Sequence, residues 1–145
     1  MNIAEKNAIF FKKKYNTNDP FKICQNLNIF VKEYTLPPYL DGLSIKTESQ
    51  KIIVLNNTLP EYEKTIVLAR ELGHCILHDF TNNSVSDLNT YQNILKFEKE
   101  ADGFAAYLLL DNDDMKIFNI DAGTDILDIL NFSIIPKKLL KLGFE

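Results

Sequence analysis

The sequence predicts an α+β domain, because helices and strands are segregated along the chain. Two helical segments come first, a group of short strands follows, and further helices complete the chain. This order favours a small antiparallel or mixed sheet over a parallel sheet wound from βαβ units. With 145 residues, 46% of them hydrophobic, the chain can bury a core without disulfides or a structural metal. We therefore expect residues 1–145 to form one domain.

The first two helices are predicted from periodicity and from a helix-start pattern. Asn2–Tyr15 has the apolar spacing of an amphipathic helix. Asp19 supplies a capping carboxylate, and Pro20 suits the first helical position. A short helix is therefore expected from Pro20 to about Leu27.

Three strands are expected in the middle of the chain. Ile29–Tyr34, Gly42–Lys46 and Lys51–Leu55 are rich in β-branched and apolar residues. The polar turn Thr47–Gln50 separates the last two, which we expect to form a hairpin. The edge of this hairpin near Lys51–Leu55 is either simple sheet structure or a place where an extended peptide could add a strand.

The second half of the chain is predicted to be mainly helical, with one polar loop between its two long helices. Leu59-Pro60 opens a long helix, expected from about Glu61 to His78. An exposed loop is expected at Phe80–Asn93, and a second long helix at about Ile94–Leu110. The tail, residues 125–145, is expected to form two short helices.

Composition argues against several classes of protein. The net charge is −4, and the one basic run, Lys12 to Lys14, lies at a helix end, where cations complement the helix dipole. Direct binding to nucleic acid is therefore not expected. The sequence contains no run of 18 or more apolar residues, so no membrane span is expected, and no secretion signal is visible. Two cysteines are too few for a disulfide framework, which favours a cytoplasmic protein.

The first long helix carries polar residues that need partners. Arg70 and His74 are one turn apart and share a face, with Glu71 beside it. The rest of this helix is apolar on most sides, which is typical of a buried helix. Charged groups in such a place are costly unless they are paired or bind a metal.

The second long helix shows the same pattern. Glu98 and Asp102 are one turn apart, and we expect them to point inward with an apolar stripe. The polar side of the helix is expected to lie opposite. The stripe consists of Ile94, Ala105 and Leu109, and the polar side of Lys96, Lys99, Glu100 and Tyr107. Two inward carboxylates need a cation, a histidine or a metal nearby, so both helices are expected to contribute to one site.

At these two helices the chain resembles the ImmA/IrrE family of metallopeptidases. One matching stretch runs from Ala69 to His78 with the sequence ARELGHCILH, and the other runs from Glu98 to Leu109 with the sequence EKEADGFAAYLL. Family members carry His-Glu-Leu-Gly-His and then a Glu-x-x-Ala-Asn/Asp-x-Phe-Ala block. The resemblance covers most of the chain and implies a small zincin-like domain, with a sheet before the active-site helix pair and a helical segment at the C-terminus.

The resemblance implies a role for each polar residue. His74 corresponds to the second zinc ligand, and Glu98 to the third. Glu71 corresponds to the catalytic base that activates water. Asp102 would orient a ligand histidine from behind.

Arg70 departs from the family pattern, because it stands where the first ligand histidine is expected. Guanidinium stays protonated and has no lone pair for a metal. We therefore expect zinc to be absent or weakly bound, with Arg70 paired to Glu98 or Asp102 in place of the metal. A rewired set of His74, His78 and Glu98, which Cys75 could join, is the alternative. Whether Arg70 is natural or engineered stays open.

The resemblance also implies a function in a prophage or other mobile element. Family members cleave or inactivate helix-turn-helix repressors. The leading hypothesis is a pseudoenzyme-like regulator that binds such a repressor without efficient proteolysis. The alternative is an active zinc endopeptidase with a non-standard ligand set, so enzymatic activity remains uncertain. A third possibility is an idle inherited site on a protein that functions through another surface.

Overall fold

A computed structural model describes residues 1–78 and 91–111. It confirms the α+β prediction, with a three-stranded sheet placed between helical segments of the chain. No helix within these two ranges is long and apolar enough to cross a membrane. The elements are α1 (Ile3–Tyr15), α2 (Pro20–Asn26), β1 (Ile29–Tyr34), β2 (Gly42–Lys46), β3 (Lys51–Asn56), α3 (Glu61–Leu77) and α5 (Tyr91–Leu109).

The first helices begin at the residues that local chemistry selects. The Asn2 side chain accepts a hydrogen bond from the Glu5 amide at the start of α1. The Asp19 side chain does the same for Phe21 at the start of α2, with Pro20 at the first helical position. The predicted bounds of both helices are confirmed within about one residue.

The second long helix begins earlier than predicted. Residues 91–93 were expected in the polar loop, yet they form the first turn of α5. They are polar but include no proline or glycine, so nothing in the backbone prevents the helix from extending over them. The rest of the predicted loop and the predicted tail helices lie outside the described residues.

The sheet is mixed, in the order β1-β3-β2. β3 pairs in parallel with β1 and antiparallel with β2, so the predicted hairpin is confirmed. However, β3 is the central strand, and its backbone is hydrogen-bonded on both sides. The suggested peptide-binding edge near Lys51–Leu55 is therefore wrong, because the sheet edges are β1 and β2.

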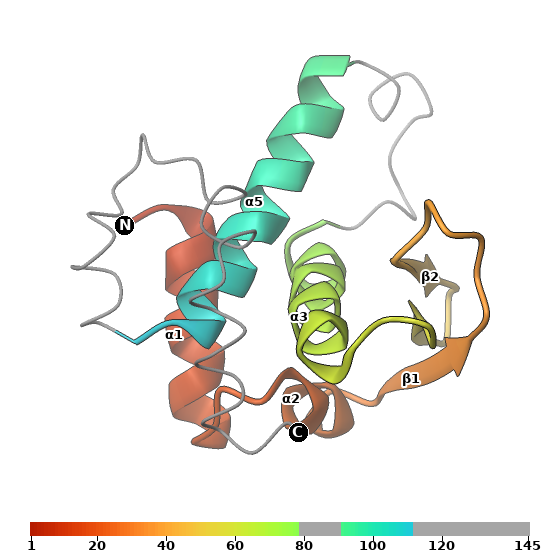
Figure 1. Ribbon diagram of the computed structural model, residues 1–145. Helices are drawn as coiled ribbons and strands as arrows, with labels where there is room; N and C mark the ends of the chain where they lie inside the picture. The colour runs from red at the N-terminus through yellow and green to blue at the C-terminus, as the bar shows by residue number, and fades with distance from the viewer. Residues whose placement is uncertain (79–90, 112–145) are drawn as a thin grey trace.

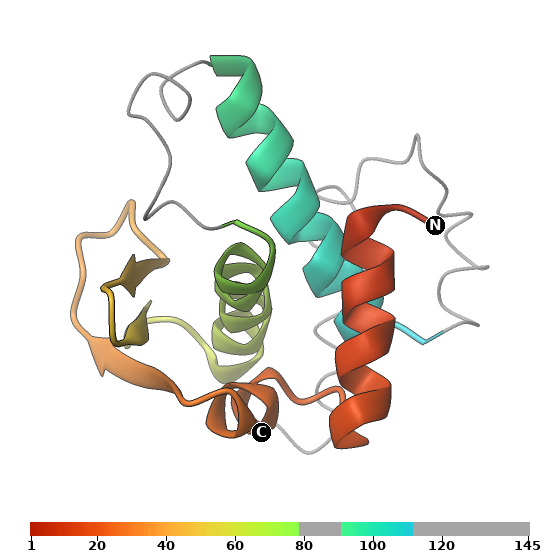
Figure 2. The same cartoon turned by 180° about the vertical axis from the view of Figure 1, so that it is seen from behind.

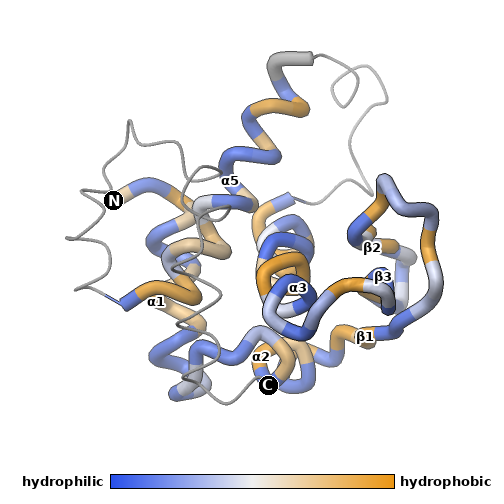
Figure 3. The backbone as a smooth tube through the Cα atoms, viewed as in Figure 1, coloured by the Kyte–Doolittle hydropathy of each residue, from blue (hydrophilic) through white to orange (hydrophobic). Residues whose placement is uncertain are grey.

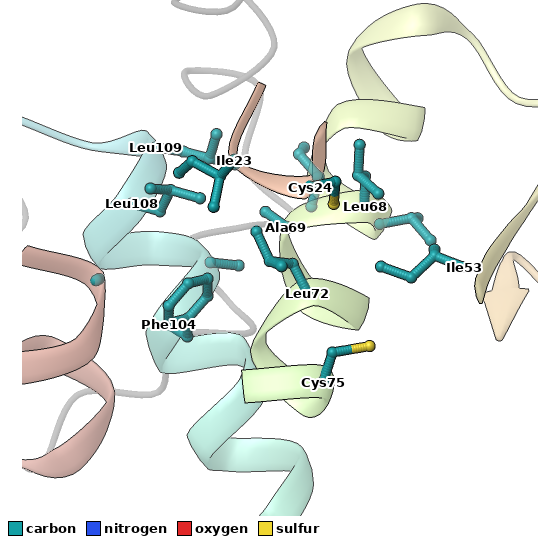
Figure 4. Close-up of a cluster of buried hydrophobic side chains, with 14 of the residues drawn as sticks. Ile23, Cys24, Ile53, Leu68, Ala69, Leu72, Cys75, Phe104, Leu108 and Leu109 are labelled. Carbon is teal, nitrogen blue, oxygen red and sulfur yellow. The ribbon is translucent and has the colours of Figure 1, made fainter. Parts of the chain in front are cut away.

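The elements are arranged around α3, which has the sheet on one side and α5 on the other (Figures 1 and 2). α1 packs along α5, and α2 lies across the end of α3. Polar and apolar residues alternate along α5, as expected for a helix with one buried side (Figure 3). Leu72, Phe104 and Leu108 are fully buried and fill the space between α3 and α5 (Figure 4).

One glycine allows α3 and α5 to approach closely. A Cβ atom at Gly73 would lie 3.1 Å from the Phe104 Cβ and 3.2 Å from both the Cα and the carbonyl oxygen of Ala101. The last two atoms are backbone and cannot rotate away. The absence of a side chain at Gly73 therefore sets the distance between the two helices that carry the polar residues.

Two lysines hold the end of α3 against the sheet. Lys46 and Lys51 are directly opposite each other on β2 and β3, where like charges repel. Lys51 Nζ donates to the Cys75 carbonyl at 3.3 Å, and Lys46 Nζ donates to the His78 carbonyl. The partial negative charge at the helix C-terminus offsets their repulsion and fixes the turn that contains His74.

We expect Gly73→Ala to destabilise the fold although alanine is the better helix former. Overpacking costs about 1–3 kcal/mol, and the gain in helix propensity returns about 1 kcal/mol. The net loss in the free energy of unfolding should be about 1 kcal/mol, measured by urea denaturation. An unchanged or increased stability would show that α3 and α5 separate easily.

Candidate functional site

The site is a row of polar side chains between α3 and α5. Three of them lie one helical turn apart on α3, and their partners lie on α5. The α3 residues are Arg70, His74 and His78, and the α5 residues are Glu98, Glu100 and Asp102. The sequence analysis predicted that the two helices share a site, and the ion pairs between them confirm this.

Arg70 contacts both carboxylates that were expected to surround it. Its Nε lies 2.8 Å from Asp102 Oδ1, and its Nη2 lies 3.8 Å from Glu98 Oε2. The shorter contact is an ion pair with poor hydrogen-bond direction, since Arg70 Nε and both Asp102 oxygens lack a well-aligned partner among the described residues. The expected pairing of Arg70 is confirmed, but its contact with Asp102 lacks the two parallel hydrogen bonds of an ideal arginine–carboxylate pair.

Asp102 is the most buried charged group of the site, with 1% of its surface exposed. Burial raises the pKa of its carboxyl to about 6, while the nearby Arg70 guanidinium acts in the opposite direction. The guanidinium therefore offsets only part of the cost of burying this carboxylate.

Glu98 contacts two side chains of α3, Arg70 and His74. Its Oε1 lies 3.3 Å from His74 Nε2, while its Oε2 faces Arg70. The hydrogen bond with His74 is the main cause that lowers the pKa of Glu98, and the charge of Arg70 adds to it. Glu98 points toward α3 as expected, but its side chain lies at the edge of the interface and is 45% exposed. Ile94 is exposed as well, since the N-terminal end of α5 projects past α3 (Figure 1).

Glu71 lies on the side of α3 that faces β2. Burial raises the pKa of its carboxyl, whereas His74 and a hydrogen bond with Ser44 act against this shift. A carboxylate with a raised pKa beside a polar site is suited to accept a proton from water. The arrangement is compatible with the base role implied for Glu71 by the resemblance.

Glu100 is a site residue that the sequence analysis did not identify. It was expected on the polar side of α5, yet its Oε2 lies 3.0 Å from His78 Nε2. His78 Nδ1 in turn lies 3.0 Å from His74 Nδ1. The feature of the sequence that could have identified Glu100 is His78, a histidine one turn after His74 that needs a polar partner.

The described residues do not fit a catalytic zinc ion. Tetrahedral ligands at about 2.0–2.2 Å from zinc are about 3.3 Å apart, and His74 Nε2 and Glu98 Oε1 have this separation. No third donor completes this pair among the residues that the structure describes, because Arg70 has no lone pair and places a positive charge beside Glu98. In residues 1–78 and 91–111, no group of three or more histidines, cysteines or acidic residues is arranged to hold a metal.

The rewired ligand set is not gathered in this arrangement either. His74 faces Glu98 with Nε2 and His78 with Nδ1, and these nitrogens point away from each other. One ion cannot contact both partners and the His74 ring at once. Burial raises the pKa of Cys75 to about 11, so its thiol stays protonated at neutral pH when no metal is bound.

Removing the guanidinium should raise the pKa of Asp102 further. With a folded pKa of about 6 against an ordinary 3.8, the protonated form favours folding. This contribution is complete below pH about 4 and is lost as the pH rises through about 6. In Arg70→Met the pKa of Asp102 should rise, so its stabilising contribution should persist to higher pH. Carbon NMR of the Asp102 carboxyl measures this titration. Lys99→Met, an exposed change on the same helix, is the control, and equal titration in both variants would contradict the pairing.

Comparison with known proteins places this arrangement in a family. A family model of peptidase M78, described as the IrrE N-terminal-like domain, matches residues 24–133. The protein named "Uncharacterized immunity region protein 2" of Bacillus phage phi105 is 36% identical over 98 residues. This match covers 68% of the chain but 62% of the length of the phage protein. The family is of the zinc metallopeptidase type, and the match covers α3 and α5 with all the polar residues of the site. The chain belongs to the peptidase M78, IrrE N-terminal-like family.

Proposed function

We propose that this chain is a regulator of a phage or other mobile element that binds a helix-turn-helix repressor without efficient proteolysis. In this proposal Arg70 takes the place of the first zinc ligand of the family. The partner class comes from the family resemblance. The name of the phage phi105 relative, an immunity region protein, supports a role in the control of phage functions.

The observation that carries the proposal is the contact of Arg70 with Glu98 and Asp102. The guanidinium supplies the positive charge that two neighbouring carboxylates require. It cannot polarise a peptide carbonyl as a metal does, and it leaves no open position for water. Zinc lowers the pKa of bound water to about 7, far below that of free water. Without that shift, Glu71 alone has too weak a nucleophile to activate at neutral pH.

An active endopeptidase is the competing candidate, and one observation favours it. His74, His78 and Glu98 are in sequential contact at 3.0 and 3.3 Å, so the three side chains of the rewired set are neighbours in the site. A metal shared by all three would require His78 or Glu98 to move to the other's side of the His74 ring. The two candidates differ in metal content and in their dependence on Glu71.

We expect Arg70→His to create a zinc site. The new imidazole would stand one turn before His74, which is the spacing of two zinc ligands on one helix. The purified variant should contain about one zinc per chain, measured by mass spectrometry of metals, whereas the unaltered chain should contain little.

Arg70→Met is the matched control for this experiment, because it removes the charge without adding a donor. It should remain nearly free of zinc. Stoichiometric zinc in the unaltered chain would contradict the proposal. A zinc-free Arg70→His protein that is folded would show that Glu98 is not the third ligand.

We expect the regulatory effect to be independent of Glu71. The chain and the repressor encoded beside its gene should form a complex in which the repressor stays intact, followed by size-exclusion chromatography and mass spectrometry. Glu71→Gln should bind equally well, because no proton transfer is involved. If the chain is an active peptidase, cleavage fragments should appear, and Glu71→Gln should slow their formation by at least about 100-fold.

The same experiment distinguishes the third possibility. If neither a complex nor cleavage fragments form with this repressor, the proposed partner is wrong and the function lies on another surface. Circular dichroism of the Glu71→Gln variant confirms that it retains the helical content of the unaltered chain.

A further inference from the structure

A groove runs along the free edge of β1, on the side of the sheet away from β2. Its volume is about 330 Å³, and it is lined by residues of α2, of β1 and of the turn between them. These residues are Phe21, Gln25, Asn28, Ile29, Phe30 and Val31. No residue of β3 is among the described residues that line it, although β3 pairs with β1 along its whole length. The groove therefore lies at the edge of the sheet and not on one of its faces.

The short connection from α2 to β1 forms this groove. Asn28 has a left-handed backbone conformation, with φ at 58°, which asparagine adopts more readily than most residues. The chain turns sharply there and leaves Phe21 and Gln25, one helical turn apart, beside the first residues of β1. In Figure 1, α2 leads directly into β1. The helix is thus one wall of the groove, and the strand is the other.

The backbone of β1 offers hydrogen-bonding groups to the groove. Along a strand, the backbone groups of alternate residues point to opposite edges. The Tyr34 carbonyl accepts a hydrogen bond from the Asn57 amide at 3.0 Å, so the backbone groups of Tyr34 point to the β3 side. Val31 is an odd number of positions from Tyr34, and its N–H and C=O therefore point to the free edge. Within residues 1–78 and 91–111, no strand pairs with this edge.

The surroundings of the groove carry positive charge that is not balanced. Lys22 on α2 and Lys32 on β1 are exposed, and neither forms an ion pair with another described residue. The acidic residues next to them along the chain are already engaged. Asp19 caps α2, and Glu33 lies 2.8 Å from Lys64 Nζ. The charge beside the groove is therefore complementary to an acidic ligand.

The two faces of the sheet differ at this edge. Val31 is opposite Ile53, which is fully buried on the face that α3 covers. α2 packs against α3 and so places Phe21 on the same side. Lys32 follows Val31 along the strand and points to the other face. The edge is thus apolar on the α3 side and cationic on the outer side.

We propose that this groove binds an extended acidic segment of a partner protein, which adds to the sheet as a strand beside β1. Strand addition uses main-chain hydrogen bonds for affinity and side-chain pockets for specificity. Val31 supplies the main-chain groups at the edge. A segment in which apolar and acidic residues alternate matches both sides, because its apolar side chains lie against Phe21 and its acidic side chains lie beside Lys32.

This docking surface is separate from the row of polar residues between α3 and α5. β2 is the strand that approaches that row, through the hydrogen bond of Ser44 with Glu71, and β1 lies at the opposite edge of the sheet. A partner bound at β1 leaves the α3–α5 site free. The surface is therefore independent of Arg70 and of the proposed repressor complex.

A synthetic peptide of alternating leucine and aspartate, blocked at both ends, is the probe for this surface. Added to the ¹⁵N-labelled full chain, it should shift the amide signals of Val31 and its neighbours in β1 until they saturate. A peptide of alternating leucine and lysine is the matched control and should bind at least about 3-fold more weakly. Absence of saturable shifts in β1, or equal binding of the two peptides, would overturn the proposal.

Two variants separate the contributions of backbone and charge. Val31→Pro removes the N–H at the free edge, and proline is tolerated in edge strands. It should abolish the shifts while the circular dichroism spectrum stays unchanged. Lys32→Glu should weaken binding of the aspartate peptide by about 3–10-fold and strengthen binding of the lysine peptide. Lys13→Glu, an exposed change on α1, should leave both nearly unchanged.

The variants also decide against the proposal if they behave otherwise. Unchanged binding by a folded Val31→Pro protein would show that the peptide does not add to β1. If that variant does not fold, Lys32→Glu decides alone, and an unchanged preference for the aspartate peptide would count against the assignment. A second copy of this chain is the competing occupant. Shifts in β1 that grow with protein concentration, without any peptide, would assign the edge to self-association instead.

Discussion

The close contact of α3 and α5 at Gly73 is the constraint on which the site depends. Ala101 and Phe104 pack so closely against the backbone of Gly73 that a Cβ there would lie 3.1–3.2 Å from them, which would crowd the two helices. A glycine inside a helix costs about 1 kcal/mol relative to alanine. In return, residues one turn before and one turn after Gly73 come within reach of α5. Arg70 meets Asp102 and His74 meets Glu98 because the helix backbones are this close.

The electrostatic balance of the site is incomplete. Asp102 keeps a pKa of about 6 although Arg70 Nε lies 2.8 Å away, so burial costs this carboxylate more than the guanidinium returns. Such a result is ordinary for buried ion pairs, where desolvation competes with attraction. Glu98 is less costly, because its side chain is nearly half exposed and has a second partner in His74. Arg70 thus acts as an internal counter-ion for both carboxylates, but it offsets only part of the free-energy cost of burying Asp102.

The sequence predicted those features that depend on local spacing and missed those that depend on long-range neighbours. Helical periodicity, combined with the cost of burying unpaired charges, was sufficient to predict that Arg70 lies near Glu98 and Asp102. It could not show that the N-terminal end of α5 projects, and therefore exposes Ile94 and part of Glu98. It also placed Glu100 on a solvated face, because a helical wheel does not show that the end of α3 covers this part of α5. The central position of β3 was hidden for the same reason, since strand order is set by pairing between distant segments.

A site stabilised by its own cation separates folding from metal supply. In the proposed regulator, α3 and α5 are held by Arg70 and by the packing around Gly73, so the surface offered to a partner does not change with zinc concentration. A protein that cleaves a repressor acts many times, whereas one that only binds acts once per copy and must be present in comparable amounts. The replacement of one ligand by arginine would therefore change the control of the system from turnover to stoichiometry. The contacts of Glu98 with Arg70 and His74 then have a structural consequence even without metal, because they keep this carboxylate at the junction of the two helices.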